Sequence, residues 1–115
     1  MELNEYQLQA QATAEYPRQG DNLLYPAIGL GEEAGEVLGK IKKLWRNRGV
    51  TSALDAEFTE EDRQALIKEC GDILWYTAAM ASELKTTLEI IAQTNLAKLQ
   101  DRKARGVIKS EGDNR

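Results

Sequence analysis

The sequence contains no histidine, and this absence excludes several kinds of active site. Nucleophile systems that use histidine as the base are excluded, as are histidine-ligated zinc sites and the Glu-x-x-His di-iron bundle. Any chemistry in this chain must therefore use carboxylates, amines, hydroxyls or metal-bound water. A site built from oxygen ligands alone would select a hard cation, and we expect Mg²⁺, or Mn²⁺ as a second choice.

Cysteine, basic stretches and long apolar runs are also scarce. The single cysteine, Cys70, cannot form a disulfide within the chain, which suits a reducing cytosol. The first residues do not resemble a signal peptide, and no run of about 18 apolar residues could span a bilayer. The net charge is −4 without a long basic stretch, which argues against a nucleic-acid polymer as partner. We therefore expect a cytoplasmic protein that binds neither a membrane nor a nucleic-acid polymer.

The chain has the length of one domain, at 115 residues, and its apolar residues recur at helical spacing. Pro17 ends a first helix, Pro26 begins a second, and Gly49 follows the end of the second. The segment Thr59-Glu-Glu-Asp62 resembles a capping box that opens a third helix. We predict an all-α fold like a four-helix bundle, with helices at about 4–15, 26–48, 59–84 and 87–105. These helices form a domain of residues 1–106, and residues 107–115 form a polar C-terminal tail.

Two short acidic motifs carry most of the functional information: Glu33-Ala-Gly-Glu36 and Glu69-Cys-Gly-Asp72. Two carboxylates three residues apart point to nearly the same side of a helix. Rotation by 100° per residue places both pairs on the same rotational side of their helix's apolar stripe. The short connector favours antiparallel packing, which brings the two pairs together. Two like charges about 5 Å apart repel by roughly 3 kcal/mol at an effective dielectric near 20, so the cluster predicts a Mg²⁺ site.

The second helix has an apolar face and a separate ridge of small residues. The apolar face consists of Leu30, Ala34, Val37, Leu38, Ile41, Leu44 and Trp45. Gly31, Gly35 and Gly39 are spaced by four residues, and we expect another helix to approach them closely, either within the chain or across a subunit boundary. In the third helix, Cys70 lies on the apolar face and is predicted to be a small core residue.

Several other side chains are candidates for contacts with a ligand. Asn95 lies in the apolar stripe of the fourth helix and is expected to need a hydrogen-bonding partner. Lys98 and Arg102 at the edge of that stripe can neutralise phosphate oxygens or remain solvated. Lys40 and Lys43 follow the first acidic motif, and they too can either neutralise phosphate oxygens or remain solvated. The candidates for stacking on a nucleobase are Tyr25, Trp45, Phe58, Trp75 and, as the best of them, Tyr76.

The chain resembles the MazG-like, all-α nucleoside triphosphate pyrophosphohydrolases from Tyr6 onward. The matching segments are Gly29–Val37 with Lys42-Lys43, Glu69–Tyr76, the residues Asn95, Lys98 and Arg102, and the ending Gly112-Asp-Asn-Arg115. The combination of E-x-x-E, a spacer and E-x-x-D is specific as a set, although each half is weak alone. The spacer is somewhat longer than in compact members of the family.

The resemblance implies Mg²⁺-dependent hydrolysis of a nucleoside or deoxynucleoside triphosphate to the monophosphate and pyrophosphate. It implies that Glu33, Glu36, Glu69 and Asp72 bind the metal and that the chain forms a homodimer or homotetramer. We expect Glu33 and Glu36 to be catalytic, with Glu36 as the candidate general base. The residues expected to bind the substrate are Asn95, Lys98, Arg102, Tyr76 and Lys43.

Two alternatives stay open at the level of the sequence. The chain could cleave a pyrophosphate bond in a nucleotide metabolite such as phosphoribosyl-ATP, which a panel of substrates would reveal. It could also be a non-catalytic helical interaction module whose acids bind a metal structurally. Folding that depends on metal, without hydrolysis of any nucleotide, would indicate the second alternative.

Overall fold

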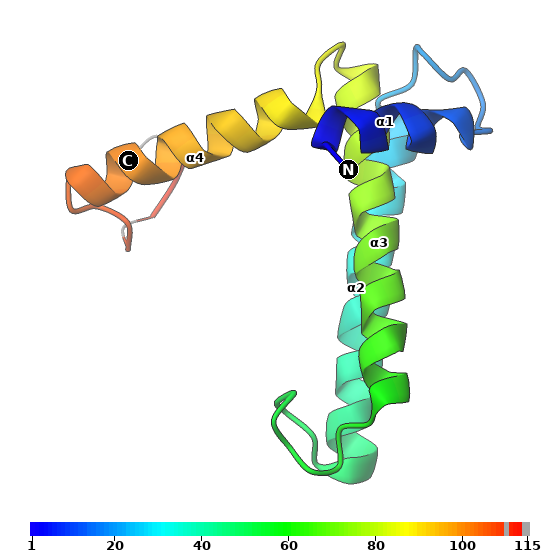
Figure 1. The fold of residues 1–115 in the computed structure, drawn as a ribbon, viewed down its shortest axis with the longest axis vertical. Helices are drawn as coiled ribbons and strands as arrows, with labels where there is room; N and C mark the ends of the chain where they lie inside the picture. Colours follow the sequence, from blue (N-terminus) through cyan, green and yellow to red (C-terminus); the bar gives the residue numbers. More distant parts are fainter. Residues whose placement is uncertain (110, 114–115) are drawn as a thin grey trace.

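The fold consists of four α-helices in a computed structural model that describes residues 1–109 and 111–113, a part of the chain that contains no strand. The helices are α1 (Leu3–Ala12), α2 (Leu24–Arg48), α3 (Glu60–Glu83) and α4 (Leu88–Ala104). The predicted all-α fold with four helices is thereby confirmed. Helices α2 and α3 form a long antiparallel hairpin, α1 crosses it near the open end, and α4 leads away from it (Figure 1).

Local sequence signals fix the closed end of the hairpin. Gly49 follows α2 with a φ of 69°, a left-handed conformation that glycine adopts without strain. The predicted capping box is present, because the Thr59 hydroxyl accepts the backbone N–H of Asp62 and the Asp62 carboxylate accepts that of Thr59. Arg48 donates to Asp62 at 2.6 Å and to the carbonyl of Glu57 at 2.8 Å. These contacts join the end of α2 to the start of α3.

Two helix ends differ from the prediction. Helix α1 ends at Ala12, because the hydroxyl of Thr13 donates to the carbonyl of Ala10 and accepts the indole N–H of Trp75. The hydrogen bond from Trp75 of α3 to Thr13 turns the chain away from the axis of α1. Helix α2 begins at Leu24, so Pro26 is its third residue and not its first. Proline is tolerated there because the N–H groups of a first turn have no acceptor within the helix.

The hydrophobic core lies where α1, α3 and α4 meet. Its buried members are Ala10, Ala78, Ala81 and Leu88, and Tyr6, Trp75 and Ile91 pack around them. Gln7 is buried beside this core, where its side-chain amide accepts the N–H of Leu88 and donates to the carbonyl of Thr86. The buried amide is thereby satisfied, and it holds the turn from which α4 departs.

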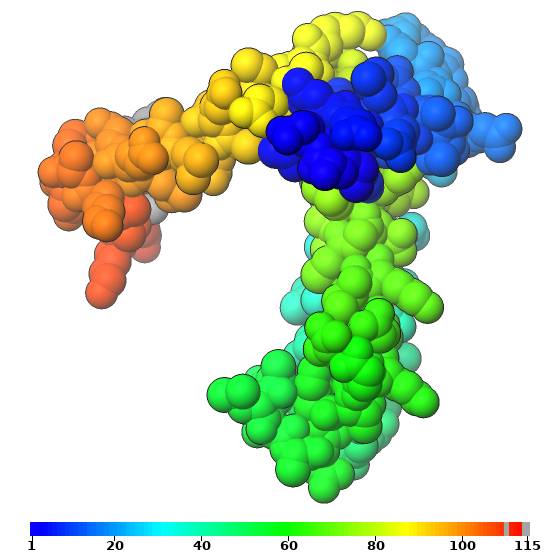
Figure 2. All heavy atoms as spheres, in the orientation of Figure 1, coloured from blue at the N-terminus to red at the C-terminus, as the bar shows by residue number. Residues whose placement is uncertain are grey.

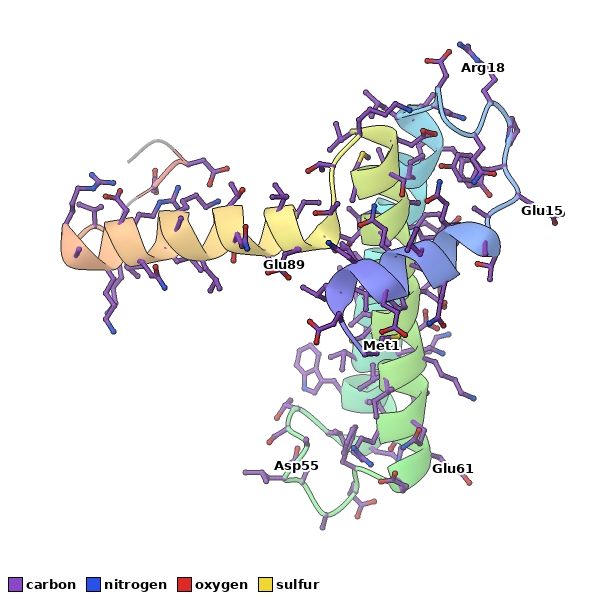
Figure 3. All side chains as sticks on the ribbon, turned by 45° about the horizontal axis from the view of Figure 1, so that its top comes forward. Met1, Glu15, Arg18, Asp55, Glu61 and Glu89 are labelled. Carbon is purple, nitrogen blue, oxygen red and sulfur yellow. The ribbon has the colours of Figure 1, made fainter. Side chains whose placement is uncertain are left out.

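The described chain is open in shape. Among the four helices, α2 packs against α3 alone, and α4 contacts only α1 and α3. The radius of gyration is 17.1 Å, whereas a compact domain of this length has about 13 Å. Figure 2 shows the arm formed by α4 standing clear of the hairpin, and Figure 3 shows Glu89 at the point where that arm begins. There the backbone N–H of Glu89 donates to the side chain of Asn4 on α1.

Part of the predicted core is exposed. Leu38 and Trp45 of α2 are 71% and 65% exposed, and Cys70 of α3 is exposed as well, so the prediction that Cys70 is a core residue is wrong. Compared with the predicted orientation, α2 is rotated about its own axis. Gly29, Glu33 and Leu44 lie toward α3, and about half of the predicted apolar face is exposed. The glycine ridge is also open, since a Cβ atom at Gly31, Gly35 or Gly39 would meet nothing within 4 Å. Among the described residues, no helix has both the length and the apolar character required to cross a bilayer.

Candidate active site

Three of the four predicted metal ligands come together between α2 and α3. One carboxylate oxygen from each of Glu33, Glu69 and Asp72 lies within 4.8 Å of the other two. The rotation of α2 directs Glu33 toward α3, where Glu69 and Asp72 lie one turn apart on the facing side. Glu33 and Glu69 are partly buried, and Asp72 is exposed. The arrangement therefore has one side open to an incoming ligand.

The negative charges of the cluster are only partly balanced. Loss of water around Glu33, followed by the charges of Asp72 and Glu69, raises the pKa of Glu33 above its ordinary value. The ammonium of Lys40 lies 3.5 Å from a carboxylate oxygen of Glu69, and the Lys40 side chain is 40% exposed. Among the described residues, Lys40 is the one cation that forms an ion pair with these three acids, so this part of the chain leaves the cluster with a net negative charge.

The donor set fits a hard divalent cation. A Mg²⁺ ion holds oxygens at about 2.1 Å, so its ligand oxygens are roughly 3–4 Å apart. The separations of up to 4.8 Å among the three carboxylates need only small side-chain rotations to reach that range. A bound cation would also offset the charges of Asp72 and Glu69, which add to the loss of water in raising the pKa of Glu33.

Glu36 lies one turn beyond Glu33 on α2 and is exposed. It does not belong to the group of three carboxylates whose oxygens lie within 4.8 Å of one another. The sequence predicted that all four acids face one site, and Glu36 is the one that the structure does not bring into the cluster. Lys43, two turns further along α2, is exposed.

An open recess adjoins the cluster, and five side chains line it: Thr13, Glu33, Asp72, Trp75 and Tyr76. The ring of Tyr76 lies directly on the backbone of Gly29, where a Cβ atom would be 2.1 Å from the ring atom Cε1. Gly29 thus allows the ring to lie flat against α2 beside the acids. The predicted place of Tyr76 next to the acidic motifs agrees with this geometry. Thr13 was missed, because nothing in the sequence indicates that the end of α1 reaches α3.

Aromatic rings continue from the recess toward the N-terminal loop. Trp75 and Tyr76 meet edge to face at 5.0 Å, Tyr76 lies 6.4 Å from Tyr25, and Tyr25 stacks on Tyr16 at 4.8 Å. Of the predicted stacking candidates, the structure therefore brings Tyr25, Trp75 and Tyr76 together. Trp45 lies near the closed end of the hairpin and Phe58 in the connector, both apart from this group.

A buried carboxylate that the sequence did not reveal holds this aromatic group in place. Glu83 is 8% exposed and accepts the backbone N–H of Gly20 at 2.8 Å and the hydroxyl of Tyr16 at 3.1 Å. Burial and the neighbouring carboxylate raise the pKa of Tyr16 to about 12. The Lys85 ammonium donates to the carbonyl of Gly20 at 2.8 Å. These bonds fix the loop between α1 and α2 against the end of α3.

The predicted substrate-binding residues of α4 lie away from the acids of the same chain. Helix α4 leads away from the hairpin (Figure 1), with Asn95 near its middle and Lys98 and Arg102 on its outer half. Asn95 is exposed, so its amide has access to water and does not require a buried partner. Lys98 and Arg102 both bind the carboxylate of Asp113 in the tail.

The fold and the site together define an all-α protein with a carboxylate cluster beside an aromatic recess. Residues 22–107 match the family described as the MazG nucleotide pyrophosphohydrolase domain. The chain is also 43% identical, over 120 residues, to the Gene 37 protein of Mycobacterium phage L5, and the match covers 100% of each chain. The comparison with solved structures found no match. The chain belongs to the MazG nucleotide pyrophosphohydrolase family, which confirms the resemblance, and its substrates are accordingly nucleotides.

Proposed function

We propose that the protein hydrolyses nucleoside or deoxynucleoside triphosphates between the α- and β-phosphates, in the presence of Mg²⁺, to the monophosphate and pyrophosphate. The observation that carries this proposal is the meeting of Glu33, Glu69 and Asp72 within 4.8 Å of one another in a chain of this family. The aromatic recess beside the acids supports a nucleotide as the ligand, because ring faces stack on nucleobases.

The side chains have separate roles in this proposal. Glu33, Glu69 and Asp72 would hold Mg²⁺, which when bound neutralises phosphate oxygens and lowers the pKa of water. Glu36, exposed one turn from Glu33, accepts the proton of the attacking water as general base. Tyr76 and Trp75 offer their rings to the nucleoside, and Lys43 on the exposed side of α2 is available to a phosphate oxygen.

We also propose that the chain works as a homodimer or homotetramer. Its accessible surface is 8357 Å², whereas a folded monomer of 12.9 kDa exposes about 6,300 Å². The excess of about 2,000 Å² is in the range that a stable interface buries. The exposed apolar residues of the hairpin form the natural contact: Leu38, Ile41, Trp45, Ile67 and Leu74. On ideal helices these residues lie on the edge opposite the acids, so a second copy would cover them and leave the cluster open.

An oligomer would also give the basic edge of α4 access to substrate. Because α4 leads away from the acids of its own chain, Lys98 and Arg102 would contact the phosphates bound by a neighbouring copy. Arginine and lysine on this edge suit the two departing phosphate groups, since their charges offset the charge that develops there.

The experiment is an analysis of products by ³¹P NMR for a panel of nucleotides with and without Mg²⁺. We expect pyrophosphate and nucleoside monophosphate only when Mg²⁺ is present, and loss of turnover in Glu69→Gln and Asp72→Asn. Glu61→Gln, an exposed acid two turns earlier on α3, is the matched control and should retain full activity. Orthophosphate as the first product would contradict the proposed cleavage site.

A further inference from the structure

The described residues after α4 fold back along the helix. Gly106 has a φ of 71°, and the N–H of Val107 donates to the carbonyl of Arg102, which reverses the chain. The described residues that follow run beside α4 (Figure 1). Asp113 thereby reaches Lys98 and Arg102, the two cations of the basic edge.

Asp113 binds both of these cations through the same carboxylate oxygen. Its Oδ1 atom lies 3.3 Å from Nζ of Lys98 and 3.2 Å from Nη2 of Arg102. The same Nη2 donates to the backbone carbonyls of Gly112 and Asp113. The tail thus presents three oxygens to a single nitrogen of the guanidinium.

The described part of the tail leaves one nitrogen of the Arg102 guanidinium without an acceptor. The side chain is 4% exposed, and its Nε is buried without a hydrogen-bond partner among the described residues. Nε and one Nη of a guanidinium form a fork that matches two oxygens of a carboxylate or a phosphate. A buried donor without an acceptor costs free energy, so the site favours a ligand that satisfies both nitrogens.

The ion pair between Lys98 and Asp113 is easily exchanged. The side chain of Asp113 is 82% exposed and that of Lys98 is 38% exposed, and ion pairs with such access to water are weak. A phosphate group carries more negative charge than a carboxylate and has three oxygens to distribute over the two cations.

We propose that Asp113 is an internal competitor that holds Lys98 and Arg102 in the free protein and is displaced by the phosphate groups of the ligand. The inference rests on the proposed role of these two residues in binding phosphate. In the exchange, phosphate oxygens replace Oδ1 of Asp113 and the carbonyl oxygens of Gly112 and Asp113 on Nη2 of Arg102, and a further phosphate oxygen accepts from Nε. Binding of substrate and release of Gly112 and Asp113 from Arg102 are thereby one step.

Calorimetric titration of the full-length protein with inorganic tripolyphosphate, without divalent metal, tests this exchange. Asp113→Asn removes the competing charge and should tighten the Kd about threefold to tenfold, as expected for loss of a weak competing ion pair. Asp101→Asn is the matched control, because it removes an equal charge from the neighbouring position on α4, where the acid pairs with Arg105. The control should change the Kd less than about twofold.

Three outcomes would overturn the proposal. Equal effects of Asp113→Asn and Asp101→Asn would show only a general charge effect. Weaker binding in Asp113→Asn would show that the tail closes over the ligand and does not compete with it. Unchanged tripolyphosphate binding in Lys98→Gln would remove the phosphate-binding role of the basic edge, whereas Mg²⁺-dependent hydrolysis would still be decided separately by the product analysis.

Discussion

Replacement of Gly29 by alanine tests the packing of α2 on α3 beside the acids. The new Cβ atom would lie 2.1, 2.4 and 2.5 Å from three atoms of the Tyr76 ring. Carbon atoms in contact are normally about 3.5–4.0 Å apart, so the ring must withdraw by about 1.5 Å or the helices must separate. The ring has little room to withdraw, because Trp75 lies 5.0 Å away on one side and Tyr25 lies 6.4 Å away.

The expected change in the free energy of unfolding for Gly29→Ala is the sum of two opposing effects. Overpacking of this kind costs about 1–3 kcal/mol, and replacing glycine by alanine within a helix contributes about 1 kcal/mol of stability. Gly29→Ala should therefore lose up to about 2 kcal/mol in the free energy of unfolding. Gly71→Ala is the matched control, because a Cβ at Gly71 meets nothing within 4 Å. The control should gain about 1 kcal/mol, so the difference between the two variants measures the packing cost alone.

Urea unfolding followed by circular dichroism gives both free energies. Combining Gly29→Ala with Tyr76→Ala should remove the clash, so that the cost of the double variant is less than the sum of the two single costs. Stabilisation of Gly29→Ala to the level of Gly71→Ala would refute the placement of the Tyr76 ring on Gly29. The packing of α2 on α3, and with it the recess beside Glu33, would then be incorrect.

Three further predictions concern other parts of the molecule. The pKa of Tyr16 is raised to about 12, so the neutral Tyr16 hydroxyl stabilises the folded protein below pH 10, and this stabilisation is lost as the pH rises toward 12. Tyr16→Phe should abolish this pH-dependent loss of the free energy of unfolding, as measured by urea unfolding. The bonds from Arg48 and from Thr59 lower the pKa of Asp62 to about 2, so its contribution is lost as the pH falls from its ordinary value of 3.8 toward 2. Asp62→Asn should lower the melting temperature at pH 7 and reduce that acid dependence. Leu38→Gln should shift sedimentation toward the monomer without lowering helicity, whereas an unchanged sedimentation coefficient would argue against the proposed interface.

Most helix ends were predictable because they depend on neighbouring residues, whereas the end of α1 depends on the distant contact with Trp75. Thr59 caps α3 through contacts three residues away, and Gly49 ends α2 through its own backbone conformation. That the two acidic motifs lie on the same side of the hairpin was also predictable, from the helical period together with antiparallel packing, whereas the direction of Glu33 toward Glu69 and Asp72 depends on the rotation of α2. Within this pattern the sequence does not separate Glu36, which is exposed, from the three clustered acids.

The rotation of α2 and the direction of α4 were not predictable. The apolar face of α2 is wide, and its period does not indicate which half contacts α3 and which half, including Leu38 and Trp45, remains outside. The direction of α4 depends on a turn in which Lys85 has a φ of 59° and on the amide of Gln7, which is far away in the sequence. The anchoring role of Glu83 arises from similarly distant contacts.

Calorimetric titration with Mg²⁺ tests most directly whether Glu33, Glu69 and Asp72 together hold a divalent cation. We predict saturable binding to the wild-type protein, at least about tenfold weaker binding to Glu69→Gln, and unchanged binding to Glu61→Gln. Equal affinities of the wild type and Glu69→Gln would contradict the account, because the three carboxylates would then be a cluster of surface charges and not a metal site.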